Sequence, residues 1–248
     1  MTSPLLRFDR VSLNAPLGNA TLLNDISFAL NPGDRCVLIG PSGSGKTQLL
    51  RLCNRLSEAS HGEIRFDGQA LASWPVRQYR EIVTLVLQES SLLAQTVEAA
   101  IAYPLKLRGL KPATLQQRVT DWCDRLNLPA EWMRKTEVQL SVGQRQWVAL
   151  TRALAIEPKL LLLDEPTSAL DAGRSDRLVR VLTDLAHQNG TAIVMTTHQF
   201  DIARGFATRL LYLENGRLLR DQSADVVDWE ALKQDVIAIE QQSKSEWD

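Results

Sequence analysis

The sequence predicts an α/β protein built on a doubly wound, mostly parallel sheet. Three observations predict this class. The chain contains short, almost fully apolar runs, typical of strands buried on both faces, at residues 35–40, 81–88, 159–165 and 191–198. Stretches with helical periodicity separate these runs, as parallel β-α-β units require. With 248 residues, of which 44% are hydrophobic, the chain can also bury a full core.

The N-terminal elements indicate a second, antiparallel sheet. Residues 5–13 and 22–30 alternate apolar and polar side chains, as strands with one exposed face do. The turn sequence NPGD at 31–34 separates them from the first apolar run. We then expect a helix from Gly45 to about Leu56 and a further strand and turn at 61–71.

The middle of the chain is predicted to be helical. Its helical stretches lie at 96–109, 114–128 and 130–135. Pro104 interrupts the first of them, so we expect that helix to break there. The remaining elements follow as a helix at 143–156, a strand at 159–165, a helix at 172–188, a strand at 191–198, a helix at 199–206 and a hairpin turning at Asn215–Gly216. We therefore expect one domain over 1–248, with a core at 1–89 and 157–222, an inserted helical subdomain at 90–156 and a helical tail at 223–248.

Composition and charge argue against several classes of protein, although a local basic patch stays open. The formal net charge is −1, so no overall field attracts nucleic acid, and we expect no nucleic-acid partner. Cys36, Cys53 and Cys123 form no CxxC pair and are expected to be reduced, buried thiols. The N-terminal residues do not read as a signal peptide, and no run approaches the roughly 18 apolar residues of a membrane span. We expect a chain that is soluble when isolated and can still dock on a membrane-embedded partner.

The residues GPSGSGKT at 40–47 match the phosphate-binding pattern G-x-x-x-x-G-K-[ST]. They follow an apolar strand and precede a helix, the context in which backbone N–H groups wrap around a phosphate. We expect Lys46 to reach the β- and γ-phosphates and Thr47 to offer its hydroxyl to Mg²⁺. The predicted ATP-binding residues are Gly40, Pro41, Ser42, Gly43, Ser44, Gly45, Lys46, Thr47 and Gln48.

Two adjacent carboxylates end the apolar run at 159–165. Asp164 and Glu165 would lie at the carboxyl edge of the parallel sheet, where ligands of α/β proteins bind. We expect Asp164 to hold Mg²⁺ and Glu165 to orient and deprotonate the attacking water. His198 ends the run at 191–198, from which it could hydrogen-bond to the γ-phosphate.

A second anion cradle is predicted at LSVGQ, residues 140–144, where a short polar turn opens a helix. The Ser141 hydroxyl and free backbone N–H groups at a helix start can contact an anion. Val142 is β-branched and disfavours a positive φ, so we expect it to be extended or helical. Gly143 is expected to keep a flexible, phosphate-facing role.

Taken in order, these residues make the chain resemble the ATP-binding subunits of ABC transporters over about residues 5–220. The resemblance implies a P-loop NTPase core of the RecA-like kind, with an N-terminal antiparallel sheet and an inserted helical subdomain. The matching motifs are the Walker A loop at 40–47, the Q-loop Gln88, the signature LSVGQ at 140–144, the Walker B strand ending at Asp164, the following Glu165, the D-loop SALD at 168–171 and the switch His198.

The resemblance also implies a homodimer of head-to-tail subunits that shares two ATP sites. Ser141, Gly143 and Gln144 of one subunit would contact the ATP bound by the Walker A loop of the other. The implied residue roles are catalysis for Lys46, Gln88, Glu165 and His198, a D-loop function for Asp171, and Mg²⁺ binding for Thr47, Gln88 and Asp164. Such a clamp closes when ATP is present and opens after hydrolysis, which would power a separate permease.

The subunit would work peripherally, on the cytoplasmic face of the membrane. Its helical insert would dock on the permease through residues such as Leu92, Leu93, Val97 and Tyr103. The sequence after Gln88 is also similar to the FetA-type group, whose members include an ATPase implicated in iron export and plant relatives linked to aluminium tolerance. That likeness implies metal-ion export.

Two alternative functions fit the sequence less well. A soluble ABC ATPase acting on nucleic acid or ribosomes would usually carry two ATPase domains, long coiled coils or zinc-binding cysteines. This chain has one such domain, no heptads and no set of four cysteines. A catalytically idle regulatory module is disfavoured because Lys46, Asp164, Glu165 and His198 are all present.

Overall fold

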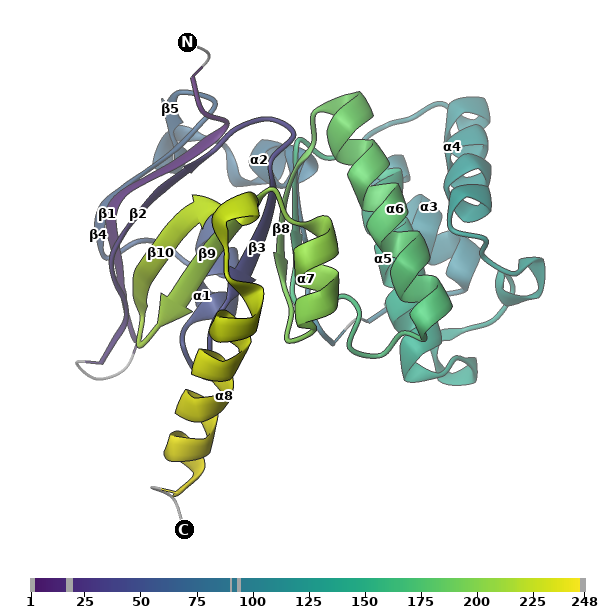
Figure 1. Cartoon of the computed structure of the whole chain (residues 1–248). Helices are drawn as coiled ribbons and strands as arrows, with labels where there is room; N and C mark the ends of the chain where they lie inside the picture. Colours follow the sequence, from purple (N-terminus) through teal and green to yellow (C-terminus); the bar gives the residue numbers. More distant parts are fainter. Residues whose placement is uncertain (1–2, 17–19, 90, 93–94, 246–248) are drawn as a thin grey trace.

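The computed structural model describes residues 3–16, 20–89, 91–92 and 95–245, and within them the strands form two sheets (Figure 1). The larger sheet has the spatial order β10 (Arg217–Ser223), β9 (Arg209–Glu214), β3 (Arg35–Ile39), β8 (Ala192–Thr196), β7 (Leu160–Leu163) and β6 (Val83–Val86). From β9 to β6 all neighbours are parallel, whereas β10 runs antiparallel to β9. The predicted α/β class with a mostly parallel core sheet is therefore confirmed.

The parallel strands are buried on both faces, which explains their unbroken apolar sequences. In β3, Val37 and Ile39 belong to one hydrophobic cluster and Cys36 and Leu38 to another. Successive side chains of a strand point to opposite faces, so each face of the sheet needs its own cover. The chain's three cysteines are free and buried, as predicted.

The smaller sheet covers one of these faces and is antiparallel, as predicted. Its spatial order is β2 (Thr21–Leu30), β1 (Leu6–Asn14), β4 (His61–Phe66) and β5 (Gln69–Ala70). Phe8 of β1 stacks on Phe28 of β2, with ring centroids 4.6 Å apart. Helix α1 (Lys46–Cys53) contributes Leu49 and Leu50 to the same cluster, so the helix after the phosphate loop is anchored here.

Helices cover the other face of the core sheet. They are α3 (Val97–Leu107), α4 (Pro112–Arg125), α5 (Val142–Ala155), α6 (Ala172–Asn189) and α7 (Phe200–Phe206). Helices α3, α4 and α5 contact one another and lie at the right of the view in Figure 1. The expected break at Pro104 is wrong, because α3 continues through it. Ile101 and Leu105 are fully buried on either side of the proline, and this packing outweighs the lost hydrogen bond.

Several other boundaries differ from the predicted ones. Helix α1 ends at Cys53 because Arg55 takes a left-handed φ of 55°. Helix α2 (Val76–Ile82) takes the first residues of the strand expected at 81–88 and buries Tyr79. The helix expected at 130–135 is only a 3-10 turn, η2 (Ala130–Trp132). The other 3-10 turns are η1 (Leu71–Ser73), η3 (Glu137–Gln139) and η4 (Ala224–Val226).

The tail forms one long helix, α8 (Trp229–Ser245), which follows β10 and contacts α7. Leu232 and Val236 of α8 are buried in the cluster on the helical side of the core sheet. In Figure 1, α8 is drawn in yellow and extends away from this attachment toward the bottom of the view. Among the described helices, none has the length and apolar character needed to cross a membrane.

Candidate active site

Three adjacent strands of the core sheet bring the predicted site residues together. In the strand order β3-β8-β7, the phosphate loop follows β3, His198 follows β8 and the acidic pair follows β7. These strands are parallel, so all three segments leave the sheet at its carboxyl edge. The sequence analysis placed the acidic pair at this edge, and the strand order brings the three segments side by side.

The phosphate loop is tightly packed and carries a buried positive charge. A Cβ at Gly40 would lie 1.9 Å from the Leu213 carbonyl oxygen, so only glycine fits there. Lys46 Nζ donates hydrogen bonds to the carbonyls of Gly40 and Pro41 at 2.7 and 2.9 Å, and burial lowers the pKa of this ammonium group. Ser44 Oγ is buried without a hydrogen-bond partner among the described residues. A buried cation beside an unsatisfied donor fits an anionic ligand.

Asp164 connects the phosphate loop to the neighbouring strand. Thr47 Oγ1 donates to Asp164 Oδ2 at 2.8 Å, and Thr196 Oγ1 donates to Asp164 Oδ1 at 2.8 Å. Threonine hydroxyl and carboxylate oxygens are hard ligands that suit Mg²⁺, which usually keeps several waters and binds only a few protein groups. The described residues contain no cluster of three or more His, Cys, Asp or Glu side chains able to hold a metal ion.

Glu165 is held in place from the adjacent strand β8. Its φ is 49°, a left-handed conformation that is uncommon outside glycine, and its N–H donates to Thr196 Oγ1 at 2.9 Å. Its Oε2 accepts from the His198 backbone N–H at 3.3 Å, while Oε1 lies 3.3 Å from His198 Nε2. Burial raises the pKa of the Glu165 carboxyl, and the charges of His198 and Lys46 partly oppose this rise. The arrangement gives a buried, oriented carboxylate that can accept a proton.

Thr196 is a site residue that the sequence analysis missed. Its hydroxyl donates to Asp164 and accepts from the Glu165 backbone, so it fixes both acidic residues at once. The available signal was a threonine at the end of an otherwise apolar strand, two residues before His198.

The signature segment begins helix α5 and is engaged within its own chain. Ser141 Oγ accepts from the Gln144 N–H at 3.2 Å, and Gln144 Oε1 accepts from the Ser141 N–H at 2.9 Å, which forms a capping box. Val142 is the first residue of the helix, as allowed by the prediction, and is 61% exposed. The flexible role expected of Gly143 is wrong. Gly143 lies inside the helix, and a Cβ there would be 2.3 Å from the Ala169 carbonyl oxygen, so close approach to the D-loop requires glycine.

The remaining predicted residues are Gln88, the signature residues and Asp171. They take no part in the hydrogen bonds described above between the phosphate loop, the acidic pair and β8. Gln88 is exposed after β6 and lines a groove with Val138, Val142 and Arg145. Within the described part of the chain, the signature residues make no hydrogen bond to the phosphate loop. Figure 1 draws α5 among the helices at the right and α1 among the strands at the left. Asp171 caps α6, because its Oδ1 accepts from the Arg174 N–H at 2.9 Å.

The expected docking surface is only partly exposed. Leu92 and Val97 are fully buried in the helical cluster, so their assignment to a docking surface is wrong. The apolar side chains of an amphipathic helix face the core of their own chain. Tyr103 is 40% exposed and lines a groove with Thr84, while Leu93 lies outside the described residues.

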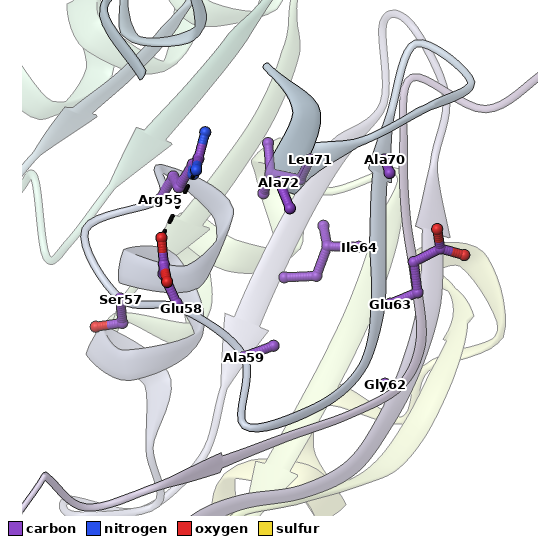
Figure 2. A pocket seen from close by; sticks show the side chains of 10 residues that line it. All are labelled: Arg55, Ser57, Glu58, Ala59, Gly62, Glu63, Ile64, Ala70, Leu71 and Ala72. Atoms are coloured by element: carbon purple, nitrogen blue, oxygen red, sulfur yellow. Dashed lines mark ion pairs between the residues drawn. The ribbon is translucent and has the colours of Figure 1, made fainter. Parts of the chain in front are cut away.

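Figure 2 shows a separate pocket of about 260 Å³ between the segment after α1 and strand β4. None of the predicted site residues lines it. Its only ion pair in the figure joins Arg55 to Glu58 at 3.6 Å, and the Glu58 side chain is 81% exposed. Surface ion pairs of this kind contribute little to stability.

Neighbouring substitutions at the signature should have very different effects. Val142→Gly removes an exposed side chain and is expected to change the ATPase rate by less than about threefold. Gly143→Ala forces α5 away from Ala169, and we expect a loss of about ten- to a hundredfold. Circular dichroism first shows that both variants fold. Steady-state phosphate release then measures the ATPase rate of each. Equal losses would contradict the packing role assigned to Gly143.

The fold and the strand-edge site define a P-loop nucleoside triphosphatase. The family model described as "ABC transporter" matches residues 23–168, and the chain belongs to this family. It is an ATP-binding, ATP-hydrolysing subunit of the ABC type.

Named relatives and solved structures agree with this membership. The chain is 35% identical to the methionine import ATP-binding protein MetN of Caulobacter vibrioides, over 90% of this chain and 68% of that protein. It is 34% identical to the glutamine transport ATP-binding protein GlnQ of Escherichia coli K12, over 90% of this chain and 93% of that protein. The ATP-binding cassette MJ0796, in a dimeric post-hydrolysis state bound to ADP and Pi, superposes with a TM-score of 0.82 at 26% identity, covering 88% of this chain and 98% of that chain.

Proposed function

We propose that the chain works as a head-to-tail homodimer whose two shared ATP sites power a separate membrane permease. The observation that carries this proposal is the convergence of the phosphate loop, the acidic pair and His198 at the edge of β3, β8 and β7. The dimer accounts for a second feature, the signature helix that makes no hydrogen bond to the loop of its own chain within the described residues.

Lys46 and the loop residues 40–48 bind the phosphates of ATP in this proposal. The Lys46 ammonium exchanges its hydrogen bonds to the Gly40 and Pro41 carbonyls for phosphate oxygens. Ser44 Oγ, which is buried without a partner among the described residues, gains an acceptor at the same time. Both changes favour binding, because a phosphate oxygen carries a negative charge that a backbone carbonyl lacks.

Thr47 and Asp164 hold Mg²⁺, with Gln88 completing the set. The bound metal ion would neutralise charge on the β- and γ-phosphates. Asp164 needs no large movement for this role, because Thr47 already donates to it across the site. Gln88 is exposed after the end of β6 and lines a groove with residues of the start of α5. Its contact with the metal ion would therefore depend on the position of the helical insert.

Glu165 accepts the proton of the attacking water, and His198 orients it. The raised pKa brings the carboxyl closer to neutral pH, where a general base is most effective. His198 contacts both carboxylate oxygens, through its backbone N–H and its ring. From this position His198 can also donate to the γ-phosphate.

Ser141, Gly143 and Gln144 contact the ATP of the partner subunit, and Asp171 lies in the D-loop at the dimer interface. Gly143 packs against Ala169, so the signature and the D-loop move together. The dimeric state of the similar cassette MJ0796 supports this arrangement. The dimer sits on the cytoplasmic face of the membrane, bound to its permease.

The transported substrate is set by the permease. The relatives named above carry methionine and glutamine in their names, which supports amino-acid transport for those proteins. Metal-ion export of the FetA type stays a prediction from the sequence likeness, and these relatives do not support it.

Mixing two inactive variants tests the shared site. A Lys46→Ala subunit lacks a working phosphate loop, and a Gly143→Ala subunit lacks a working signature. In a head-to-tail heterodimer, one site joins both defects and the other joins both intact halves. An equal mixture should therefore recover about a quarter of the wild-type activity, because about half of the dimers are mixed and each has one intact site.

The control is a mixture of Lys46→Ala with Asp164→Asn, which damages the same half-site in both subunits and should recover nothing. Phosphate release measured across a range of mixing ratios gives the readout. Recovery in the control, or none in the test mixture while gel filtration shows mixed dimers, would contradict the head-to-tail arrangement.

A further inference from the structure

The C-terminal helix places a carboxylate in the phosphate loop. Glu240 Oε1 accepts from the backbone N–H of Ser42 at 3.1 Å and lies 3.4 Å from Ser42 Oγ. The same oxygen lies 4.0 Å from His198 Nδ1. Glu240 is also one of the charges that raise the pKa of Lys46 against the lowering effect of burial. One carboxylate therefore interacts with the loop backbone, the loop lysine and the switch histidine.

Helix α8 is built to hold Glu240 in this position. Leu232, Val236 and Glu240 follow one another at four-residue spacing, so they lie along one face of the helix. The first two are 0% and 2% exposed in the helical cluster, which anchors the start of α8. Arg220 of β10 pairs with Asp235 at 3.1 Å and adds a second attachment. The anchored half of the helix fixes the direction in which its far end, with Glu240, reaches the loop.

The contacts of Glu240 are those that a phosphate needs. A carboxylate accepts hydrogen bonds from backbone N–H groups and attracts an ammonium group in the way a phosphate oxygen does. A triphosphate in the loop would meet Glu240 as a second anion competing for the same donors. Asp164 and Glu165 already supply negative charge there. Holding Glu240 and a triphosphate at the same time would therefore add repulsion between anions.

We propose that Glu240 is an internal competitor of ATP, so that α8 in its observed position closes the phosphate loop and must withdraw its far end before nucleotide binds. The proposal rests on the function proposed above, that the loop takes the phosphates of ATP. Withdrawal needs only the last turns of α8 to move, because Leu232 and Val236 can remain in the core. The apparent affinity for ATP is then lowered by the fraction of molecules in which the helix occupies the loop.

Removing the charge of Glu240 while keeping its size tests the proposal. In the full chain, Glu240→Gln is expected to bind a fluorescent ATP analogue about tenfold more tightly than the wild type, because one charge-assisted competitor is lost. Glu230→Gln is the matched control, since Glu230 is an exposed glutamate in the first turn of the same helix. It should bind the analogue with wild-type affinity.

Hydrogen exchange gives an independent readout of the movement. Addition of ATP to the wild type should increase amide exchange in residues 237–245 and leave residues 230–236 protected. Equal affinities for wild type and Glu240→Gln, or weaker binding by Glu240→Gln, would overturn the proposal, as would unchanged exchange in 237–245 with ATP bound. If neither protein binds the analogue at all, the failure lies with the proposed nucleotide site rather than with α8.

Discussion

Glu165→Gln is expected to lower ATP turnover by about a hundred- to ten-thousandfold while ATP binding persists. The amide keeps the size of the buried carboxyl and can still accept from the His198 backbone N–H, which lies 3.3 Å away. It cannot accept the proton of the attacking water. Phosphate release measures the loss, and binding of a fluorescent ATP analogue shows that the site remains formed.

The same variant should accumulate as an ATP-bound dimer, because the hydrolysis step that opens the clamp is blocked. Gel filtration with and without ATP measures this change. Glu63→Gln, an exposed glutamate of β4 paired with Arg65, is the control and should behave as wild type. Undiminished turnover in Glu165→Gln would remove Glu165 from the role of base, and a purely monomeric ATP complex would contradict the shared site.

Asp164→Asn is expected to lower turnover by at least about a hundredfold and to remove the dependence of ATP binding on Mg²⁺. Each oxygen of Asp164 accepts one hydroxyl, from Thr47 and from Thr196, at 2.8 Å. The amide offers one acceptor and no charge, so both the bridge and the attraction for a divalent cation weaken.

ATP binding measured once with Mg²⁺ and once with a chelator distinguishes the loss of a metal ligand from a folding defect. The wild type should bind ATP more tightly with Mg²⁺, and the variant should bind it equally in both conditions. Asp67→Asn serves as control, because Asp67 forms a surface ion pair with Lys159 at 3.0 Å. A variant that kept the full Mg²⁺ effect would show that Asp164 is not a ligand of the metal.

The sequence predicted those parts of the molecule that depend on local patterns. Apolar runs identified the parallel strands, and the glycine-rich loop followed one of them as its chemistry requires. Long-range packing escaped prediction for a physical reason: it depends on the partner that the fold supplies. Pro104 sits within a helix because its neighbours are buried, and Gly143 is constrained by a carbonyl in the D-loop.

The site itself was predicted as a set of residues, and the contacts between them were not. The position of Thr196 at the end of an apolar strand marks it as a candidate, but its partner Asp164 cannot be read from the sequence because the two lie 32 residues apart. The contact between Ser42 and Glu240 leaves no local signal, because these residues are 198 positions apart. Burial of Leu92 and Val97 shows the same limit, since an apolar side chain in an insert can serve its own core or a partner.

The bridge Thr47–Asp164–Thr196 joins segments that are 117 and 32 residues apart in the chain. No fragment of the polypeptide contains these groups in working order before β3, β7 and β8 have assembled. Strand β8 is synthesised after β3 and β7, so a growing chain is unable to hydrolyse ATP until Thr196 has been added. Nucleotide bound across the three strands also adds its binding free energy to that of the folded sheet, so ATP selects for completely folded molecules.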